Sequence, residues 1–315
     1  MKRLATSVAA HDRLDALHAS IDCVKTPKTS SCQNICRHTS IIRRYNEEVN
    51  ERNFQETVWD EGRRLYRSMP WRDNTEPYWV MVSEIMLQQT QVDRVIPKFL
   101  HFMQRFPTVE ALASASLANV LEEWSGLGYN RRAKYLHQAA QQLTEMYGGT
   151  IPKDRAQLEA LPGIGPNTAG AILAYSFSLP AVFIETNIRT VFFHHFFHDD
   201  QVVTDRQMKE LAEELVDKEH PREWYWALMD YGSYLKRQGL GRLDKSKHYK
   251  KQPPLKGSIR EVRGIIIKEL TRGPSDMTSL LSALPDDERR DKAMNALLAE
   301  GMVVRDGQTI SLAGR

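Results

Sequence analysis

The chain contains little cysteine. Its 315 residues include only Cys23, Cys32 and Cys36, all within the first 40 positions. The rest of the sequence therefore cannot hold a metal cluster ligated by cysteine. With His38 the three thiols could supply four zinc ligands, but the spacing C-x8-C-x3-C-x-H matches no standard zinc-finger pattern. We interpret residues 1–44, which are polar and weakly periodic, as a disordered tail.

Long apolar runs are also lacking. None reaches the roughly 18 residues that a membrane span needs. The longest candidate, Ala169 to Ile184, is interrupted by Ser176, Ser178 and Pro180. The first residues have too short an apolar core for a secretory signal. We therefore expect no membrane association and a cytoplasmic location.

Neither sign of charge is in large excess. The 43 Lys and Arg against 40 Asp and Glu give a net charge of +3 and a pI near 8.6. A mildly basic balance permits an anionic partner without requiring one. The contents of 41% hydrophobic and 26% charged residues are ordinary for a globular protein, and the length suits one large domain or two.

Strand signals are missing from residues 45–249, where helical periodicity dominates. We predict helices over 46–68, 77–88, 93–105, 109–114, 117–122, 131–147, 155–160, 166–177, 185–197, 204–219 and 221–237. This gives a mainly α domain over residues 45–250. Residues 255–315 read as three helices followed by two strands around Asp306-Gly307, which predicts a small winged-helix-like module.

The most informative stretch is LPGIGPNTAGAILAYSFSLPAVFIETN at 161–187. Gly163 and Gly165 form a tight hairpin directly before a helix that opens at Pro166. The backbone N–H groups at this helix start predict an anion site suited to a DNA phosphate. Glu185 follows twenty residues after Gly165, which suggests chemistry on a nucleic acid.

A second candidate is SEIMLQQTQV at 83–92, where Glu84 lies within an apolar helix. Burial raises the pKa of a carboxyl, so Glu84 could hold a proton near neutral pH and donate it. It could equally be a solvated residue or a structural partner of an arginine. The polar run from Gln88 to Gln91 is suited to base edges or to the gap left by an extruded base, although such a run is also common at an exposed helix end.

These segments occur in one order with Pro70-Trp71-Arg72, Pro77-Tyr78, IPKFLHFMQRFPTVEALA and GLGY at 126–129. Together they resemble the MutY-type adenine DNA glycosylases of the helix-hairpin-helix, Gly/Pro-Asp superfamily, over roughly residues 54–235. The resemblance implies a two-lobed helical fold and removal of adenine mispaired with 8-oxoguanine or guanine. The hairpin alone is a weak motif, but its combination with SEIMLQQTQV is specific.

The resemblance also implies catalytic roles. Glu84 matches the acid that protonates adenine, and Glu185 stands where the family has an aspartate that stabilises the developing sugar cation. Glu185 is one methylene longer, which displaces its carboxylate by roughly 1.5 Å on an unchanged backbone. Glu185 could alternatively be only an acid favoured at a helix start. Asn187 matches an asparagine that holds this region.

Asn167 stands where relatives that cleave the strand carry lysine. It has no nucleophilic amine, so we expect no lyase activity. Its side chain could bond the extruded nucleotide or merely begin the helix.

The resemblance further assigns contacts with DNA. Tyr129 matches a wedge beside the opposite base, Leu87 and Gln89 match residues that enter the base stack, and Arg72 matches a residue of the adenine pocket. Core packing or a surface salt bridge is the competing interpretation of each. We call the polar run from Gln88 to Gln91 the glutamine turn. We expect further DNA contacts from Thr90 in this turn and from Gly163, Gly165 and Thr168 of the hairpin.

Most relatives bind an iron–sulfur cluster through four cysteines after the segment that matches Met229 to Gly232. That stretch has no cysteine here, so we expect no cluster and no other cofactor. Between Lys236 and Lys251 it carries seven basic residues against one acid, Asp244. We expect phosphate contacts from this basic loop, or else a solvated linker. We expect these contacts from Lys236, Arg237, Lys245 and Lys247.

Relatives also end in a domain for 8-oxoguanine of well over 100 residues, for which the 58 residues from Ser258 are too few. The acidic helix over 285–300 favours packing on the body or a protein contact over DNA reading. The sequence thus predicts a monomeric, monofunctional adenine glycosylase of base-excision repair, associated with the nucleoid and acting on double-stranded DNA with a mismatch or an oxidised base. The alternatives are a thymine or uracil mismatch glycosylase and a DNA-binding homologue with weakened catalysis.

Overall fold

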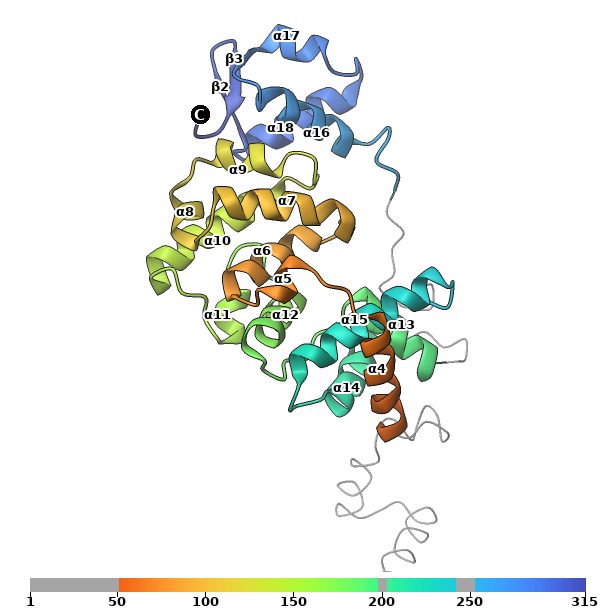
Figure 1. Ribbon diagram of the computed structural model, residues 1–315. Coiled ribbons are helices and arrows are strands. Elements are labelled where there is room, and N and C mark those ends of the chain that lie inside the picture. Colours follow the sequence, from red (N-terminus) through yellow and green to blue (C-terminus); the bar gives the residue numbers. More distant parts are fainter. Residues whose placement is uncertain (1–50, 198–202, 242–252) are drawn as a thin grey trace, which may run out of the picture. The chain divides into compact units, whose positions relative to one another are not determined.

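The computed structural model describes residues 51–197, 203–241 and 253–315 (Figure 1). The predicted tail over 1–44, with its cysteines and His38, lies outside the described residues, as do Lys245 and Lys247. None of the described helices is both long and apolar enough to cross a membrane.

The body of the protein is helical. Its helices are α4 (Glu51–Leu65), α5 (Pro70–Asp73), α6 (Pro77–Leu87), α7 (Val92–Arg105), α8 (Val109–Ser114), α9 (Leu117–Trp124), α10 (Arg131–Tyr147), α11 (Arg155–Glu159), α12 (Pro166–Phe177), α13 (Thr186–His195), α14 (Asp205–Leu215) and α15 (Pro221–Arg237).

Local sequence explains where several of these helices begin. The side chains of Thr108, Ser116, Asp154 and Thr204 each accept a hydrogen bond from a backbone N–H in the first turn that follows. Proline is the first residue of α5, α6, α12 and α15, where its missing N–H costs no helical bond. The predicted mainly α fold is confirmed. The sequence does not predict α5, because four residues are too few to show a helical period.

The hairpin helix α12 lies in the core. All its residues from Thr168 to Tyr175 are buried, and it packs against α6 and α15 (Figure 1). Helix α13 also packs on α15, where a Cβ added at Gly232 would lie only 2.1 Å from the backbone oxygen of Asn187. Glycine is therefore required for the first turn of α13 to approach α15 so closely. This packing brings α6, α12 and the start of α13 together.

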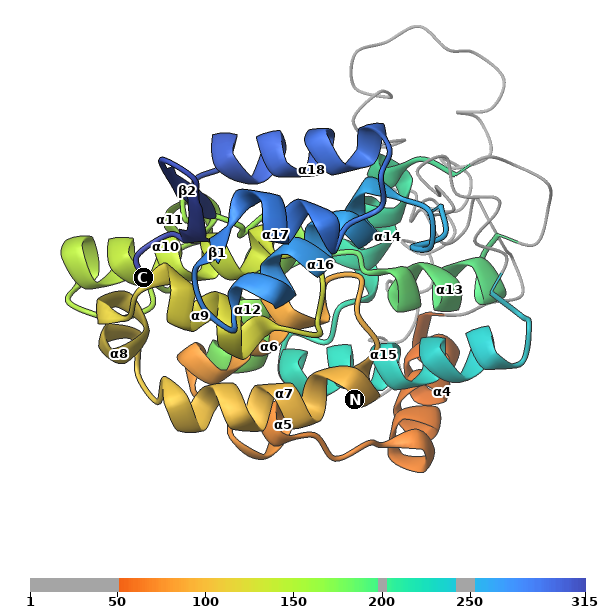
Figure 2. The ribbon, with the colours of Figure 1, turned by 90° about the horizontal axis from the view of Figure 1, so that it is seen from above.

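The C-terminal module contains α16 (Ile259–Leu270), β1 (Ser275–Asp276), α17 (Met277–Ser282), α18 (Glu288–Ala299), β2 (Val303–Asp306) and β3 (Thr309–Leu312). The strands form an antiparallel sheet in the order β1-β3-β2, and Asp306 pairs with Thr309 across the predicted turn. Helices α16 and α18 pack side by side (Figure 2). The two-residue β1 is not predicted by the sequence. The winged-helix assignment and the domain boundaries stay predictions.

Polar contacts join this module to the body. Glu300, after α18, accepts hydrogen bonds from Arg131 on α10 and from Arg263 on α16. Arg315 forms an ion pair of 2.9 Å with Glu122 on α9. The two guanidinium groups beside Glu300 lower the pKa of its carboxyl to about 2, against the effect of its partial burial. These contacts fit the expected packing of the module on the body.

Candidate active site

A cavity of about 820 Å³ opens between α6, α13 and α15. Both predicted catalytic carboxylates line it, Glu84 from α6 and Glu185 from the residue before α13. Asn187 and Tyr175 also line it. The cavity thus brings together two acids that are 101 positions apart in the sequence.

Glu84 is the only charged residue of α6, whose sequence is PYWVMVSEIML. Seven residues of this helix are buried, including Ser83 and Ile85 on either side of Glu84. Burial is the main cause that raises the pKa of Glu84 to about 8. The charge of Glu185 raises it further, and Arg72 opposes the rise. Glu84 therefore holds a proton at neutral pH and can act as an acid.

Glu185 is the N-cap residue of α13, but its side chain makes no capping hydrogen bond. Glu185 instead lines the cavity. Burial raises the pKa of Glu185 as well. The charge of Glu185 is one cause of the raised pKa of Glu84, so the two carboxyl groups titrate as a coupled pair.

Two asparagines hold the backbone around Glu185. Asn187 donates through Nδ2 to the carbonyl of Met229 on α15, at 3.2 Å. Asn167, the second residue of α12, donates to the carbonyl of Ile184 at 2.9 Å and accepts from the N–H of Ile184 at 3.2 Å. Asn167 therefore holds the residue before Glu185, and Asn187 anchors the first turn of α13 to α15.

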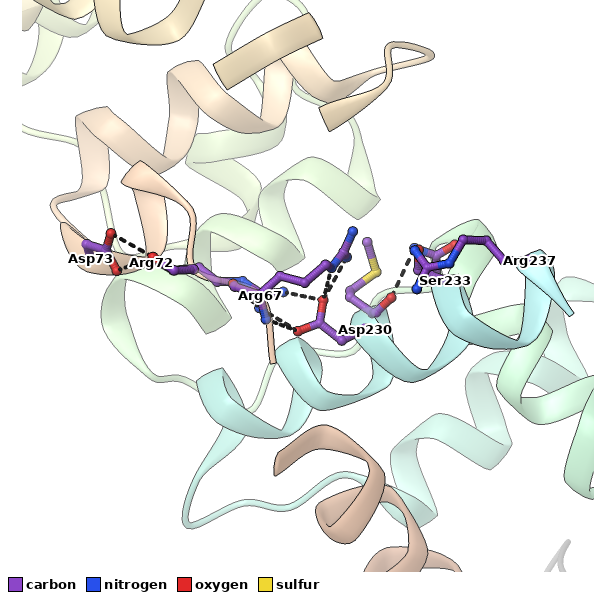
Figure 3. A network of polar contacts seen from close by, with 9 residues as sticks. Arg67, Arg72, Asp73, Asp230, Ser233 and Arg237 are labelled. Atoms are coloured by element: carbon purple, nitrogen blue, oxygen red, sulfur yellow. Dashed lines mark hydrogen bonds and ion pairs between the residues drawn. The ribbon is translucent and has the colours of Figure 1, made fainter. Parts of the chain in front are cut away.

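Arg72 lines the cavity, and its guanidinium is bound to Asp230. It donates to both carboxylate oxygens of Asp230 on α15, at 2.6 and 3.1 Å, and Arg67 binds the same carboxylate (Figure 3). Tyr66 and Trp226 lie 5.4 and 5.3 Å from its guanidinium carbon. Arg72 and Asp230 are 7% and 2% exposed, so this is a buried ion pair beneath the cavity. The structure places Arg72 as a wall of the cavity, with two of its nitrogens committed to Asp230.

The glutamine turn follows α6, and its residues Gln88, Gln89 and Thr90 line the same cavity together with Leu87 at the end of α6. Gln89 has a φ of 57°, a left-handed conformation that is uncommon for a residue other than glycine. Gln88 donates to the carbonyl of Gly163 and to the hydroxyl of Thr168, at 3.4 and 3.3 Å. The turn is therefore tied to the hairpin.

The hairpin has the predicted geometry. Gly163 has a φ of 79°, and a Cβ there would lie 2.9 Å from the Cβ of Tyr135. Gly165 is the N-cap residue of α12. Thr168 is buried and its hydroxyl accepts a hydrogen bond from Gln88, so the Thr168 side chain is directed inward.

Arg132 is an organising residue that the sequence did not indicate. Its Nη1 donates to the carbonyls of Ile85, Met86 and Gln88 at the end of α6. Its Nη2 donates to the hydroxyl of Thr90 at 3.0 Å and to the carbonyl of Gly128 at 3.1 Å. One buried guanidinium thus joins the glutamine turn to the GLGY loop.

Tyr129 ends that GLGY loop with a φ of 48°. Its ring lies over the guanidinium of Arg132, and its hydroxyl accepts a hydrogen bond from Arg260 of the C-terminal module. The predicted wedge residue is therefore held from two sides.

Lys236 and Arg237 line the cavity at the end of α15 and are exposed. The iron–sulfur cluster implied by the resemblance does not fit the donor set, because the sequence has no cysteine after Cys36. Among the described residues, no group of three His, Cys, Asp or Glu side chains could hold a metal ion.

The sequence is similar to those of known DNA repair proteins. Residues 82–218 match the profile of the HhH-GPD superfamily base excision DNA repair proteins. The chain is 32% identical over 265 residues to an adenine DNA glycosylase of Mycobacterium tuberculosis, which covers 77% of this chain and 87% of that protein. It is 35% identical over 170 residues to an adenine DNA glycosylase of Buchnera aphidicola, of which it spans only 48%.

A solved thermostable thymine-DNA glycosylase shares the fold, with a TM-score of 0.52 and 24% identity over 58% of this chain and 86% of that one. The sequence match to the mycobacterial protein runs through the helices that build the cavity and covers most of both chains. The chain therefore belongs to the adenine DNA glycosylase family, within the HhH-GPD superfamily.

Proposed function

We propose that this protein is a monofunctional DNA glycosylase that hydrolyses the N-glycosidic bond of adenine mispaired with guanine or 8-oxoguanine in double-stranded DNA. The observation that carries the proposal is the pair of carboxyl groups in one cavity, where burial and the charge of Glu185 raise the pKa of Glu84 to about 8. In this proposal Glu84 is the protonated acid and Glu185 the ionised carboxylate. A protonated acid and an ionised carboxylate are the two groups that a glycosidic bond needs for cleavage.

The reaction follows from these two states. Glu84 donates its proton to a ring nitrogen of the extruded adenine, and the electron pair of the C1′–N9 bond leaves with the base. Positive charge develops on the sugar and is stabilised by Glu185. Water then adds to C1′, and the proton that it releases restores the acid form of Glu84.

The other assignments follow the same proposal. Tyr129, Leu87 and Gln89 contact the base stack around the extruded nucleotide. The backbone of Gly163 to Gly165 and the cations Lys236 and Arg237 bind phosphates. The protein works as a monomer. It works without an iron–sulfur cluster, since the sequence lacks the cluster's cysteine ligands after Gly232. Bound iron with visible cluster absorbance in the purified protein would contradict the metal-free part.

A panel of duplexes tests the activity. The protein is incubated with A:8-oxoguanine, A:G, T:G and U:G duplexes, and abasic sites are revealed by hot alkali. We expect cleavage at adenine only. Cleavage at thymine or uracil would assign the chain a different base, and binding without cleavage would make it a DNA-binding homologue.

Two variants connect the activity to the cavity. Glu84→Gln should abolish base release and leave DNA binding intact, whereas Glu145→Gln, an exposed change on α10, should leave both unchanged. Full activity of Glu84→Gln would remove Glu84 from the mechanism.

Because Asn167 replaces the lysine of lyases, borohydride should trap no covalent complex with DNA.

A further inference from the structure

The segment that leads into Glu185 is held by side chains from outside it. Residues 178–185 connect α12 to α13 without regular structure. Arg155 on α11 donates to the carbonyl of Val182 at 2.9 Å and to the carbonyl of Pro166 at 3.1 Å. Asn167 bonds to both backbone groups of Ile184. The segment is therefore fixed against the start of α12 at two points.

The position of the Glu185 carboxylate depends on this backbone, since its side chain makes no capping bond. Two hydrogen bonds from one planar amide to one residue define both the position and the rotation of Ile184. Ile184 is 2% exposed, so water does not compete well for these bonds.

We infer that Asn167 is a positioning residue for Glu185, and that it connects the phosphate-binding hairpin to the catalytic carboxylate. Asn167 is separated from Gly165 of the hairpin by Pro166 alone. A shift of the hairpin on DNA would therefore reach Ile184 through one side chain. This inference rests on the proposed function, in which Glu185 stabilises the sugar cation.

The chain carries asparagine where a lyase carries lysine. A side chain that supplies no nucleophile here supplies two backbone hydrogen bonds instead. The bonds hold a glutamate whose length differs from that of the family's aspartate.

The first measurement compares Asn167→Leu with wild type on the A:G duplex. The leucine keeps a similar volume and removes both bonds to Ile184. We expect the single-turnover rate of base release to fall by roughly 100-fold, as for a misplacement of ~1 Å. The dissociation constant for DNA should change by less than about threefold, because the hairpin backbone is unchanged. An unchanged rate would overturn the inference.

Two further variants separate positioning from loss of folding. Gln55→Ala removes the bond of 3.1 Å from Gln55 to the carbonyl of Leu215, a comparable side-chain contact between α4 and α14 outside the cavity. It should lower Tm without changing the rate. Arg155→Met removes the bond to Val182 but leaves both bonds of Asn167 to Ile184. It should therefore lower the rate by only roughly 10-fold. If Asn167→Leu does not fold, Asn167→Ala removes the same two bonds without the larger apolar side chain, and a normal rate for that variant would overturn the inference.

The pH dependence of the rate of base release distinguishes a positioning role of Asn167 from a purely structural one. The charge of Glu185 is one cause of the raised pKa of Glu84. If Glu185 moves away in Asn167→Leu, the pKa of Glu84 falls and the alkaline limb of the rate shifts to lower pH. The other charged or titratable side chains that line the cavity or touch its wall are Arg67, Arg72, Asp93, Tyr175, Asp230, Lys236 and Arg237. None of these is altered in the variant, so an unshifted limb would contradict the inference.

The inference and the function can fail separately. If wild type releases no base, the proposed function fails. The carboxyl of Glu84 is then titrated by NMR in protein labelled with ¹³C-glutamate. A lower pKa of Glu84 in Asn167→Leu than in wild type and Gln55→Ala would still support the positioning role, and equal values would overturn it.

Discussion

At the scale of single residues, the two carboxylates differ in what surrounds them. Glu84 lies inside an apolar helix, and burial is the largest cause of its raised pKa. Burial raises the pKa of Glu185 too, but Glu185 lies at the start of α13, where the positive end of the helix dipole favours a negative charge. The same side-chain type can therefore hold a proton at one position and release it at the other.

The raised pKa of Glu84 makes stability depend on pH. A free glutamate titrates near 4.5 and folded Glu84 near 8. Between these values the folded protein keeps a proton that the unfolded chain has released, so its free energy of unfolding falls as pH rises. Glutamine does not titrate. Glu84→Gln should match wild type at pH 4 and exceed it by roughly 1–3 kcal/mol at pH 8, measured by urea unfolding.

The control for this measurement is Glu145→Gln, which should show no gap that grows with pH. A difference between Glu84→Gln and wild type that stays constant from pH 4 to pH 8 would contradict the raised pKa. The gain in stability in an inactive variant would show that the acid is kept for chemistry rather than for folding.

Glu185→Asp tests whether the cavity is built for the longer acid. Shortening the side chain withdraws the carboxylate by roughly 1.5 Å, while Asn167 keeps the backbone of Ile184 in place. We expect the single-turnover rate to fall by roughly 100-fold. Thr186→Ser, a neighbouring conservative change, is the control. A rate equal to or above that of wild type would mean that the backbone already suits the family's aspartate.

At the scale of elements, Arg132 joins the glutamine turn to the GLGY loop. Its guanidinium satisfies three carbonyls at the end of α6, which have no partner within the helix. Burial lowers its pKa to about 10, so it remains charged at neutral pH. Two loops with left-handed residues, Gln89 and Tyr129, thereby depend on one side chain.

Arg132→Met should cost about 3 kcal/mol in the free energy of unfolding, because buried carbonyls lose their donor. Arg132→Lys keeps the charge but cannot span both loops. It should therefore reduce extrusion of the base, measured by 2-aminopurine fluorescence at the target position, more than it reduces stability. Arg206→Lys, a fully exposed change on α14, is the control. Normal extrusion in Arg132→Lys would limit Arg132 to a packing role.

The sequence predicts elements better than it predicts their polar contacts. The helices over 109–114, 131–147, 166–177 and 221–237 have the predicted bounds, because caps, prolines and apolar periods lie within each segment. The partners of Arg132 and of Arg72 could not be predicted. Arg132 binds carbonyls 44 to 47 positions away, and Arg72 binds Asp230, 158 positions away. Such pairs depend on packing that no local pattern records.

The site was predicted unevenly for the same reason. Glu84 and Glu185 stand out because an acid in an apolar run is unusual. The bonds of Asn167 to Ile184 cannot be seen in the sequence, since asparagine near the start of a helix is ordinary. What the acids do follows from residue type, whereas how they are held follows only from the three-dimensional structure.

At the scale of the whole molecule, the C-terminal module contacts the body beside the predicted wedge residue. Arg260 on α16 donates to the hydroxyl of Tyr129. Glu300 binds Arg131, which lies two positions after Tyr129 in the chain. Arg263 places both its terminal nitrogens on Glu300, at 2.7 and 2.5 Å. Glu300 therefore connects α16 of the module to α10 of the body, next to Tyr129.

Glu300→Gln tests this connection through its pH dependence. The pKa of Glu300 in the folded protein is about 2, below its ordinary 4.5, so its contribution is complete above about pH 4.5 and is lost as pH falls toward 2. Glu300→Gln should lower the free energy of unfolding by roughly 1–2 kcal/mol at pH 7, with a smaller gap near pH 3. Because Arg131 begins the helix after Tyr129, the variant should also weaken discrimination between A:G and A:C duplexes. Glu288→Gln removes only the exposed pair with Lys292 within α18 and should do neither. Equal behaviour of the two variants would mean that the module is only tethered to the body.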